Sequence, residues 1–590
     1  MPPEPRSCYA FGPFVLNGAE RLLLRDGQRV AITRRAFDTL LMLVENTGRL
    51  VRKEDLIERV WRGAFVEEGN LKVTISMLRR VLRDTSGRVG QIEAVPGHGY
   101  RLLADVKVSG SAGPSLRRLE DRAVTRLMVL PFQILRPDPA TDFLGFAVAD
   151  AVASGLAAVD SIQVQSPAAA ARYSGGAGDL ERIAADSGSE VVLTGTVLRD
   201  GDRFRVTTQL LEAPAGTIIW SLDLQALVSD VFDLQNQIVN RALDSLALKL
   251  TAREQWRVKR DVPATAAAYE FYLRGNQLSY RGLRAWQDLE IARDLYVRCL
   301  EADARYAPAW AHLGRCHWLI GKAIEDSAEN LARAESCLTR ALELNPELPV
   351  AHSIYSDLLS DLGRAPEAMV RLLSRARERA ASAESYAALV KACRFCGLLD
   401  ASAAAHEQAR RLDPQIPTSI GHTYFQLRRC DKARAEIGVG TWLLDAQLLA
   451  GEGRDRDAVR LLRERESSGA PGLVRTFIVC LRALLEGKLD EFRGAIEQVI
   501  ASYVDPEVLY YVARFLARLG ERERALAMLA RSLDGGFVYF PALGLDPWFE
   551  NLRSETRFAT ILKRAEARHR KMAKKFVNAG GEELLGVRVR

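Results

Sequence analysis

Three patterns of apolar and polar residues follow one another along the 590-residue chain. Short strand-like runs mixed with helical stretches occupy roughly the first hundred residues. From about residue 122 to residue 250, apolar runs typical of strands alternate with helical stretches. From about residue 265 to residue 567, nearly every segment has helical spacing and is rich in Ala, Leu and Arg. A chain of this length exceeds what one hydrophobic core supports, so we expect several domains.

The first segment predicts three helices framed by strands. Strand-like runs are expected at 11–16, 22–24 and 29–32, and helices at about 34–46, 53–61 and 70–82. Thr33 is a good N-cap for the first helix. In the third helix, four apolar residues recur at helical spacing and are expected to face the core: Leu71, Ile75, Leu78 and Leu82. A hairpin with glycines at its tip closes the segment at Ile92–Leu102.

Several separate sequence features of this segment resemble those of one protein family. They are the sheet before the first helix, the Leu78-Arg-Arg-Val-Leu82 end of the third helix, and Gly97-His-Gly-Tyr-Arg101 in the hairpin. Together they resemble the OmpR/PhoB-type winged helix over residues 8–106. In that family the third helix enters the major groove and the wing reaches toward the minor groove. The resemblance implies a DNA-binding domain over residues 1–107.

Candidate DNA contacts are carried over from that resemblance. Those near base edges or phosphates are Asn70, Lys72, Thr74, Ser76 and Met77, those with phosphate or mixed roles are Arg79 and Arg80, and those on the wing are His98 and Arg101. Side chains on a helix face can read the major groove, whereas Arg and Lys on phosphates fix register. The third helix is less basic than in many relatives. We therefore expect weak binding by one domain and a homodimer on repeated half-sites.

The distribution of charge along the chain supports a DNA-binding domain at residues 1–107. Residues 1–107 contain 18 Lys and Arg and 13 Asp and Glu, so most of the chain's net charge of +7 lies there. The stretch 70–83 carries four basic residues and no acid. Such a strip suits a phosphate backbone, although a solvated helix face explains the charge equally well.

A Gly/Ser/Pro-rich linker is expected at 108–121, followed by an α/β domain at 122–250. The strand-like runs are 127–132, 162–164, 191–198, 204–211 and 218–224, and the helical stretches are 143–158, 180–187 and 231–250. Asp200-Gly201 predicts a tight hairpin. Val129-Leu-Pro-Phe132, Phe143-Leu-Gly-Phe146 and Leu193-Thr-Gly-Thr-Val197 resemble the TolB-like amino-terminal domain, which implies no settled chemistry.

Residues 251–567 carry an internal repeat. Gly363 and Gly397 are 34 residues apart, as are Gly453 and Gly487, and Gly520 follows 33 residues later. This period and marks such as Trp310, Leu313, Gly314, Ala334 and Pro346 resemble tetratricopeptide helix pairs. The 56-residue step between the glycines at 397 and 453 indicates one degenerate unit. We expect a solenoid whose concave face docks a protein or peptide, followed by a basic tail at 568–590.

Composition excludes some classes of protein. With 48% hydrophobic and 27% charged residues, the chain is typical of a folded globular protein. No apolar segment follows a basic start, and no window reaches the length of a membrane span, so we expect a cytoplasmic bacterial protein without a membrane partner. The eight cysteines are scattered, so we expect them to be reduced. Cys393-x-x-Cys396 has no second pair of ligands at a suitable spacing to complete a zinc site. We expect no metal and no cofactor.

The combined pattern predicts a mainly α multidomain chain with a winged helix (α+β), a middle α/β domain and a C-terminal α-solenoid. The predicted function is sequence-specific regulation of transcription at double-stranded promoter DNA, without enzymatic activity. RNA polymerase is a further partner expected of such a regulator. One alternative is an interaction scaffold whose winged helix contacts protein. A lesser alternative is a nucleotide-binding enzyme within 122–250.

Overall fold

The computed structural model describes residues 8–11, 14–17, 22–25, 28–30, 32–60, 68–82, 91–95, 97–104, 106–109, 125–136, 143–173, 180–200, 203–227, 231–246, 250–258, 260–281, 286–324, 327–378, 382–436 and 442–589. The chain divides into two compact units. The first holds residues 1–135, 149–225 and 233–258, and the second holds residues 136–148, 226–232 and 259–590.

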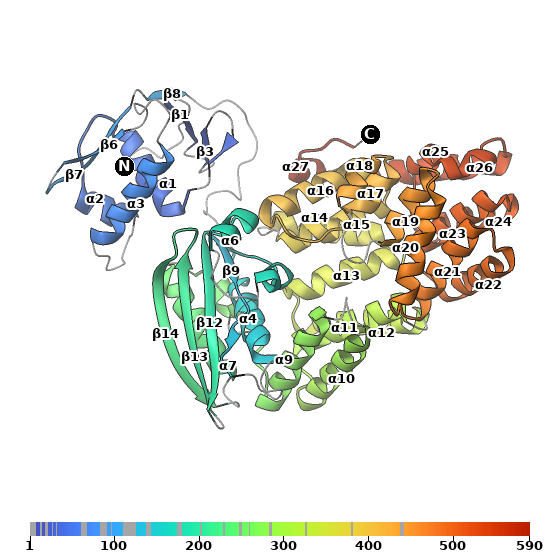
Figure 1. Cartoon of the computed structure of the whole chain (residues 1–590), viewed down its shortest axis with the longest axis horizontal. Coiled ribbons are helices and arrows are strands. Elements are labelled where there is room, and N and C mark those ends of the chain that lie inside the picture. The colour runs from blue at the N-terminus through green and yellow to red at the C-terminus, as the bar shows by residue number, and fades with distance from the viewer. Residues whose placement is uncertain are drawn as a thin grey trace. The chain divides into compact units, whose positions relative to one another are not determined.

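The first unit opens with an antiparallel sheet in the order β4-β3-β2-β1-β8 (Figure 1). Its strands are β1 (Cys8–Phe11), β2 (Phe14–Asn17), β3 (Leu22–Arg25), β4 (Gln28–Arg29) and β8 (Lys107–Ser109). The single strand expected over 11–16 is wrong, because β1 and β2 pair as a hairpin in which Phe11 lies opposite Phe14. Both rings are buried and stack with centroids 5.7 Å apart. The apolar run is therefore two short strands that share one core.

Three helices and a second sheet complete the winged helix. The helices are α1 (Arg34–Glu45), α2 (Lys53–Val60) and α3 (Glu68–Val81), and the sheet order is β5 (Val51–Arg52), β7 (Gly99–Leu103), β6 (Gln91–Val95). Thr33 caps α1 as predicted, since its Oγ1 accepts a hydrogen bond from the Ala36 N–H at 3.2 Å. The four apolar residues predicted to face the core from the third helix are all buried. The β6–β7 hairpin confirms the predicted wing.

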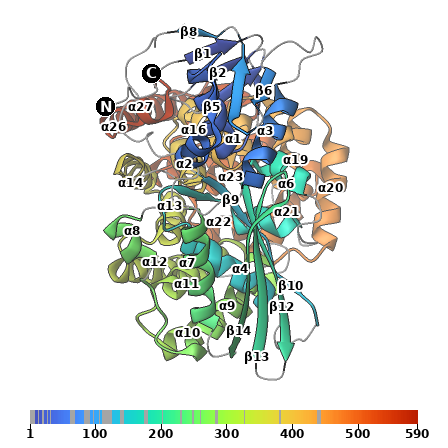
Figure 2. The same ribbon diagram turned by 90° about the vertical axis from the view of Figure 1, so that its left-hand side faces the viewer.

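The middle part is a mixed sheet with helices on one side. Its path is β11-β9-β12-β13-β14, with β10 beside β12. The strands are β9 (Thr125–Val129), β10 (Gln133–Ile134), β11 (Ile162–Val164), β12 (Val191–Asp200), β13 (Arg203–Glu212) and β14 (Thr217–Leu227). The hairpin predicted at Asp200-Gly201 is confirmed by the pairing of Asp200 with Arg203 across β12 and β13. Figure 2 shows α4 (Phe143–Leu156) and α7 (Val231–Ser245) on one side of the long strands.

Smaller helices complete this part. They are α5 (Pro167–Ala170), η1 (Ala171–Tyr173), α6 (Leu180–Ser187) and α8 (Ala252–Val258). The last of these belongs to the first unit, beyond the boundary predicted at residue 250. Its Arg257 pairs with Asp160 at 2.9 Å, and its Glu254 accepts a hydrogen bond from the Asp160 N–H at 3.0 Å. These contacts hold α8 to the domain that precedes it.

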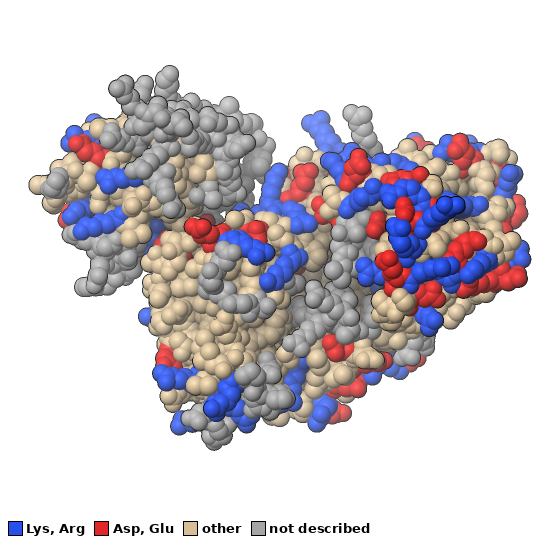
Figure 3. Space-filling model, in the orientation of Figure 1, with Lys and Arg blue, Asp and Glu red and all other residues tan. Residues whose placement is uncertain are grey.

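The second unit is built from antiparallel helix pairs, which confirms the predicted fold class. The pairs are α9 (Ala266–Arg281) with α10 (Trp286–Ala302), α11 (Ala307–Ala323) with α12 (Ser327–Leu344), α13 (Pro349–Asp361) with α14 (Ala365–Glu378), α15 (Ala383–Phe395) with α16 (Leu399–Leu412), α17 (Ile420–Gln426) with α18 (Cys430–Ala435), α19 (Trp442–Gly451) with α20 (Asp455–Ser467), α21 (Gly472–Glu486) with α22 (Leu489–Ser502), and α23 (Pro506–Leu519) with α24 (Arg522–Asp534). Figure 3 shows basic and acidic side chains intermingled over their outer surface.

The periodic glycines lie where the two helices of a pair meet. Gly363, Gly397, Gly453, Gly487 and Gly520 all have φ between 72° and 90°, the left-handed region that closes a helix end. In the degenerate unit, Arg428 takes that place between α17 and α18 with φ 60°. The repeat therefore continues through this unit with an arginine at the glycine position and two short helices.

The chain then folds back on its own repeats. After α24 come α25 (Ala542–Leu545), η4 (Pro547–Leu552), α26 (Thr556–Asn578) and α27 (Gly581–Leu585). Contacts join α26 to α14 and α27 to both α14 and α16. A separate basic tail is expected at 568–590, whereas residues 568–589 are largely helical and are packed through α26 and α27. At Gly363, an added Cβ would lie 1.7 Å from the Gly535 carbonyl oxygen, so this close return requires glycine.

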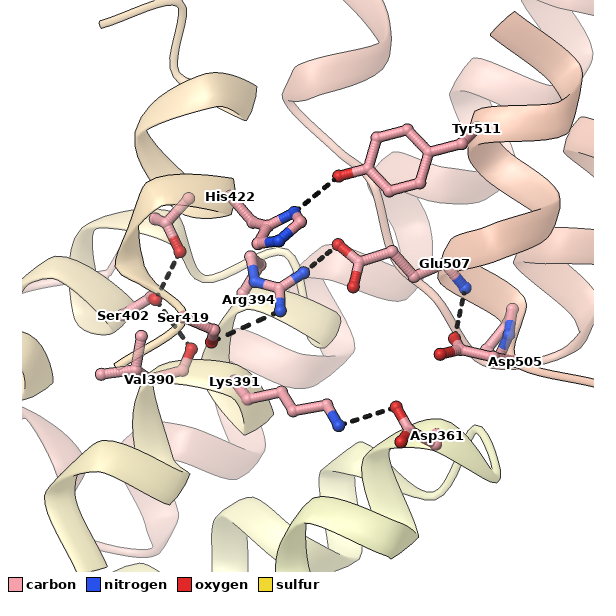
Figure 4. A network of polar contacts seen from close by, with 12 residues as sticks. Asp361, Val390, Lys391, Arg394, Ser402, Ser419, His422, Asp505, Glu507 and Tyr511 are labelled. Carbon is pink, nitrogen blue, oxygen red and sulfur yellow. Dashed lines mark hydrogen bonds and ion pairs between the residues drawn. The ribbon is translucent and has the colours of Figure 1, made fainter. Parts of the chain in front are cut away.

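A buried network of charged residues lies between α23 and the earlier repeats (Figure 4). Asp361 on α13 receives Lys391 of α15 at 2.7 Å and Lys322 of α11 at 2.9 Å. Arg394 of α15 forms an ion pair with Glu507 in the first turn of α23. Arg394 and Glu507 are 113 residues apart in the sequence, so this ion pair joins α15, in the middle of the helical unit, to α23 near its end. Among the helices described here, none is long and apolar enough to cross a bilayer.

Candidate nucleic-acid interface

Helix α3 has one buried and one exposed face. Lys72, Ser76 and Arg79 are exposed and follow one another at intervals of four and three residues. Such intervals align side chains along one face of a helix. The opposite face carries the leucines and the isoleucine that form the domain core. The fold thus holds a short stripe of two cations and a hydroxyl on a helix fixed from behind.

Two residues differ from the expected arrangement. Thr74 was expected in the exposed set, but it is only 9% exposed and belongs to the buried side of α3. Helical spacing explains this, since position 74 lies one turn from Leu71 and Leu78. Val73 is 50% exposed and was missed, because an apolar residue gave no signal for a polar surface. It lies beside Lys72 and Ser76 and can contact an apolar group such as a thymine methyl.

Arg79 connects α3 to the wing. Its Nε donates to the Ile92 carbonyl oxygen of β6 at 2.9 Å, while most of the side chain stays exposed. Among the described residues, its other guanidinium nitrogens have no hydrogen-bond partner. This arginine can therefore fix the wing relative to the helix and still bind a phosphate oxygen.

The wing is held at both strands. The His98 carbonyl oxygen accepts a hydrogen bond from the Lys53 N–H at the start of α2, at 3.2 Å, and its side chain is exposed. Gly99 permits this approach, because an added Cβ would lie 2.0 Å from the Val51 carbonyl oxygen. Arg101 is half-buried and lies opposite the exposed Glu93 across the hairpin. The acid reduces the positive charge available at that position.

The remaining predicted contacts on α3 lie at the rim of the exposed face or have side chains outside the described residues. Met77 is half-buried and packs against the domain core, so it lies at the rim of the exposed face. The backbones of Asn70 and Arg80 lie in α3, but their side chains fall outside the described residues. The structure therefore brings Lys72, Ser76 and Arg79 together and places His98 and Arg101 on the adjoining hairpin.

The cysteine pair noted in the sequence lies in the helical core. Cys393 and Cys396 are both buried, and burial raises the pKa of the Cys396 thiol to about 12. A protonated thiol is a poor metal ligand. Within the part of the chain that the structure describes, no group of three or more His, Cys, Asp or Glu side chains could hold a metal ion.

Comparison with known families identifies the N-terminal domain. Residues 27–102 match the family described as "Transcriptional regulatory protein, C terminal". The match spans α1, α2, α3 and the wing, which are the elements that build the surface described above. The N-terminal part of the chain is therefore a DNA-binding domain of the OmpR/PhoB type.

Curated relatives match larger parts of the chain. "Transcriptional regulator HilA" of Salmonella typhi is 22% identical over 360 residues, 59% of this chain and 60% of the relative. "Putative adenylate cyclase 3" of Rhizobium meliloti (strain 1021) is 27% identical over 246 residues, 41% of each chain. "TorCAD operon transcriptional regulatory protein TorR" of Escherichia coli (strain K12) is 31% identical over 100 residues, 17% of this chain and 42% of the relative. The chain thus spans between 41% and 60% of these relatives.

Proposed function

We propose that this protein is a sequence-specific regulator of transcription that reads promoter DNA through its winged helix. The observation that carries the proposal is the family match over residues 27–102, which coincides with an exposed stripe of Lys72, Ser76 and Arg79. In this proposal α3 lies in the major groove, with Ser76 at base edges and Lys72 on a phosphate. Arg79 contacts a phosphate while it fixes the wing, and Asn70 and Arg80 extend the same helix surface.

The wing and the rear domains complete the proposal. His98 and Arg101 extend the interface toward the minor groove, while Met77 and Val73 border it. Two copies on repeated half-sites raise the affinity that one weakly basic helix provides. The helix pairs dock a protein or peptide that controls the DNA-bound state, and RNA polymerase is contacted at the promoter. The protein is a regulator and not an enzyme, and its place of action is the cytoplasm.

The middle domain stays without a defined ligand. Its likeness to the TolB-like domain is part of the proposal and assigns no chemistry. The activity named for the adenylate cyclase relative is that protein's own. If residues 122–250 were instead a nucleotide enzyme, the full chain would bind or turn over a nucleotide, which this proposal does not expect.

The proposal is tested by selection of genomic DNA. Full-length protein is incubated with sheared DNA of its source genome, and bound fragments are recovered and sequenced. We expect a shared motif upstream of genes. Ser76→Ala should weaken the enrichment of this motif, whereas Lys72→Ala should reduce the recovery of all fragments about equally. Recovery of fragments without a shared motif would contradict sequence-specific binding, and recovery of no DNA even at low salt would instead support an interaction scaffold.

A further inference from the structure

β14 is an edge strand and the longest strand among the described residues. It spans Thr217–Leu227, 11 residues, and among the described residues it pairs with β13 alone. Its outer side therefore presents the backbone N–H and carbonyl groups of a long strand. A row of such groups is a template for another strand.

The strand lacks the features that usually protect an edge. Its sequence contains no Lys, Arg or Pro. Its one charged residue, Asp223, is held by Arg205 of β13, whose Nε donates to the carboxylate at 2.9 Å. Two large apolar residues near its ends, Ile218 and Leu227, are 54% and 38% exposed. Edge strands that remain single usually carry lysine, proline or a bulge, so this strand is unprotected by residue type.

The two faces of β14 differ. Trp220 is buried, and Leu222, Leu224 and Ala226 on the same face are half-buried toward the helices. Ser221, Asp223 and Gln225 on the opposite face are exposed. Figure 3 shows few charged side chains over β12, β13 and β14. The open face is therefore polar but nearly uncharged, so two such sheets can meet edge to edge without strong repulsion.

Symmetry defines how two copies would meet. A two-fold axis perpendicular to the joined sheet leaves each side chain on the same face of that sheet. The axis of an antiparallel pair must therefore pass between one residue and the same residue of the second copy. Leu222 is the midpoint of β14, and a pair centred there uses all 11 residues. Trp220 then faces Leu224 of the second copy, and Ser221 faces Asp223 of the second copy. A pair centred on Asp223 would shorten the overlap and oppose two carboxylates, which is unfavourable.

We infer that this protein forms a homodimer in which β14 pairs antiparallel with β14 of a second copy around Leu222, joining the two middle sheets. The helices α4 and α7 of both copies lie on the same side of the joined sheet. Aromatic–aliphatic cross-strand pairs form on the sheltered face, and the serine–aspartate pair forms on the open face. The pairing requires no DNA, so it can be tested independently of DNA binding.

Sedimentation equilibrium of the full-length protein without DNA tests the dimer. We expect the wild type to dimerise, and Leu222→Lys and Leu222→Glu each to weaken the dimer at least about tenfold, because like charges meet on the axis. An equal mixture of the two variants should restore association, since opposite charges then face each other. Thr207→Lys on β13 is a control that should dimerise like the wild type. A monomeric wild type at about 100 µM would overturn the inference.

A second measurement does not depend on how the charged variants fold. Across an antiparallel pair, facing Cα atoms lie about 4.5–5.5 Å apart, within reach of a disulfide. Leu222→Cys should therefore form a disulfide-linked dimer under mild oxidation. Gln225→Cys should not, because its counterpart across the axis is Ile219 of the second copy. Equal cross-linking by both variants, or by neither variant in a folded protein, would contradict the register.

Discussion

The ion pair between Arg394 and Glu507 offers a sharp test of how the helical unit holds together. Arg394 lies on α15 and Glu507 in the first turn of α23, and their side chains are only 2% and 11% exposed. Arg394 also lies near Ser419, with Nη2 3.4 Å from Oγ, and over the Phe395 ring. Burial raises the pKa of Glu507, but the positive charges of Arg394, His422 and Lys322 and the hydrogen bond from Arg394 together lower it. Arg394 acts both by its charge and by its hydrogen bond, so the two paired charges stabilise each other.

Removing one partner leaves the other charge buried and unpaired. For such a pair, a single substitution costs about 3–5 kcal/mol. We expect Arg394→Met and Glu507→Gln each to cost this much of the free energy that holds α15 and α23 closed. The double variant contains no unpaired charge, so it should cost no more than about the same 3–5 kcal/mol, well below the sum of the two.

Native-state hydrogen exchange with mass spectrometry measures this in the full chain. It reports the opening free energy of each helix, which a global melting curve of a multidomain protein does not. Arg364→Met is a matched control, because Arg364 is 42% exposed in its ion pair with Glu367 and should cost no more than about 1 kcal/mol. Strictly additive effects of the two single variants on α15 and α23 would refute the coupling.

Four further predictions concern the winged helix and the repeat. Lys72→Ala should weaken DNA binding about equally for all sequences and reduce the slope of log affinity against log salt by about one, measured by titration at several salt concentrations; an unchanged slope would remove Lys72 from the interface. Gly99→Ala should destabilise the domain by about 1–3 kcal/mol, because the added Cβ meets the Val51 carbonyl oxygen. Gly97→Ala is the control: its Cβ has nothing within 4 Å, so it should cost only about 1 kcal/mol for its positive φ. Equal losses of melting temperature in the two variants would count against this packing. Arg428→Gly should stabilise the helical unit by about 1 kcal/mol, because φ 60° suits glycine, and a lower urea midpoint would contradict it. Asp505 is the N-cap of α23. Burial and the Asp361 carboxylate raise its pKa to about 7 from its ordinary 3.8, so the folded state holds a proton that the unfolded chain releases, and stability is lost as pH rises from about 4 to 7. The uncharged Asp505→Asn variant should gain stability relative to the wild type across that window, and a constant difference in urea midpoint would disprove this.

Some parts of this fold follow directly from the sequence. Thr33 marks the start of α1, and the leucine spacing of α3 predicts its buried face, because both depend on neighbouring residues. The 34-residue glycine period predicts the turns within helix pairs, since those turns require positive φ. The exposed stripe of Lys72, Ser76 and Arg79 follows from the same spacing.

Other parts depend on contacts distant in sequence. The return of α23 to α15 pairs charges 113 residues apart, and no local pattern predicts it. The turn between α17 and α18 could not be predicted from the sequence, because Arg428 occupies the position that glycine has in the other repeats and an arginine gives no signal of positive φ. Thr74 is a candidate DNA contact carried over from the winged-helix resemblance, although its position on the helix buries it.

The central claim is that α3 reads DNA sequence. The most direct measurement is fluorescence anisotropy of the full-length protein with a selected genomic fragment and with a shuffled fragment of equal length and composition, at several salt concentrations. The account predicts tighter binding to the selected fragment at every salt concentration. It also predicts that Ser76→Ala reduces this preference more than it reduces binding to the shuffled fragment. Equal affinity for both fragments, or a preference that Ser76→Ala leaves unchanged, would contradict it.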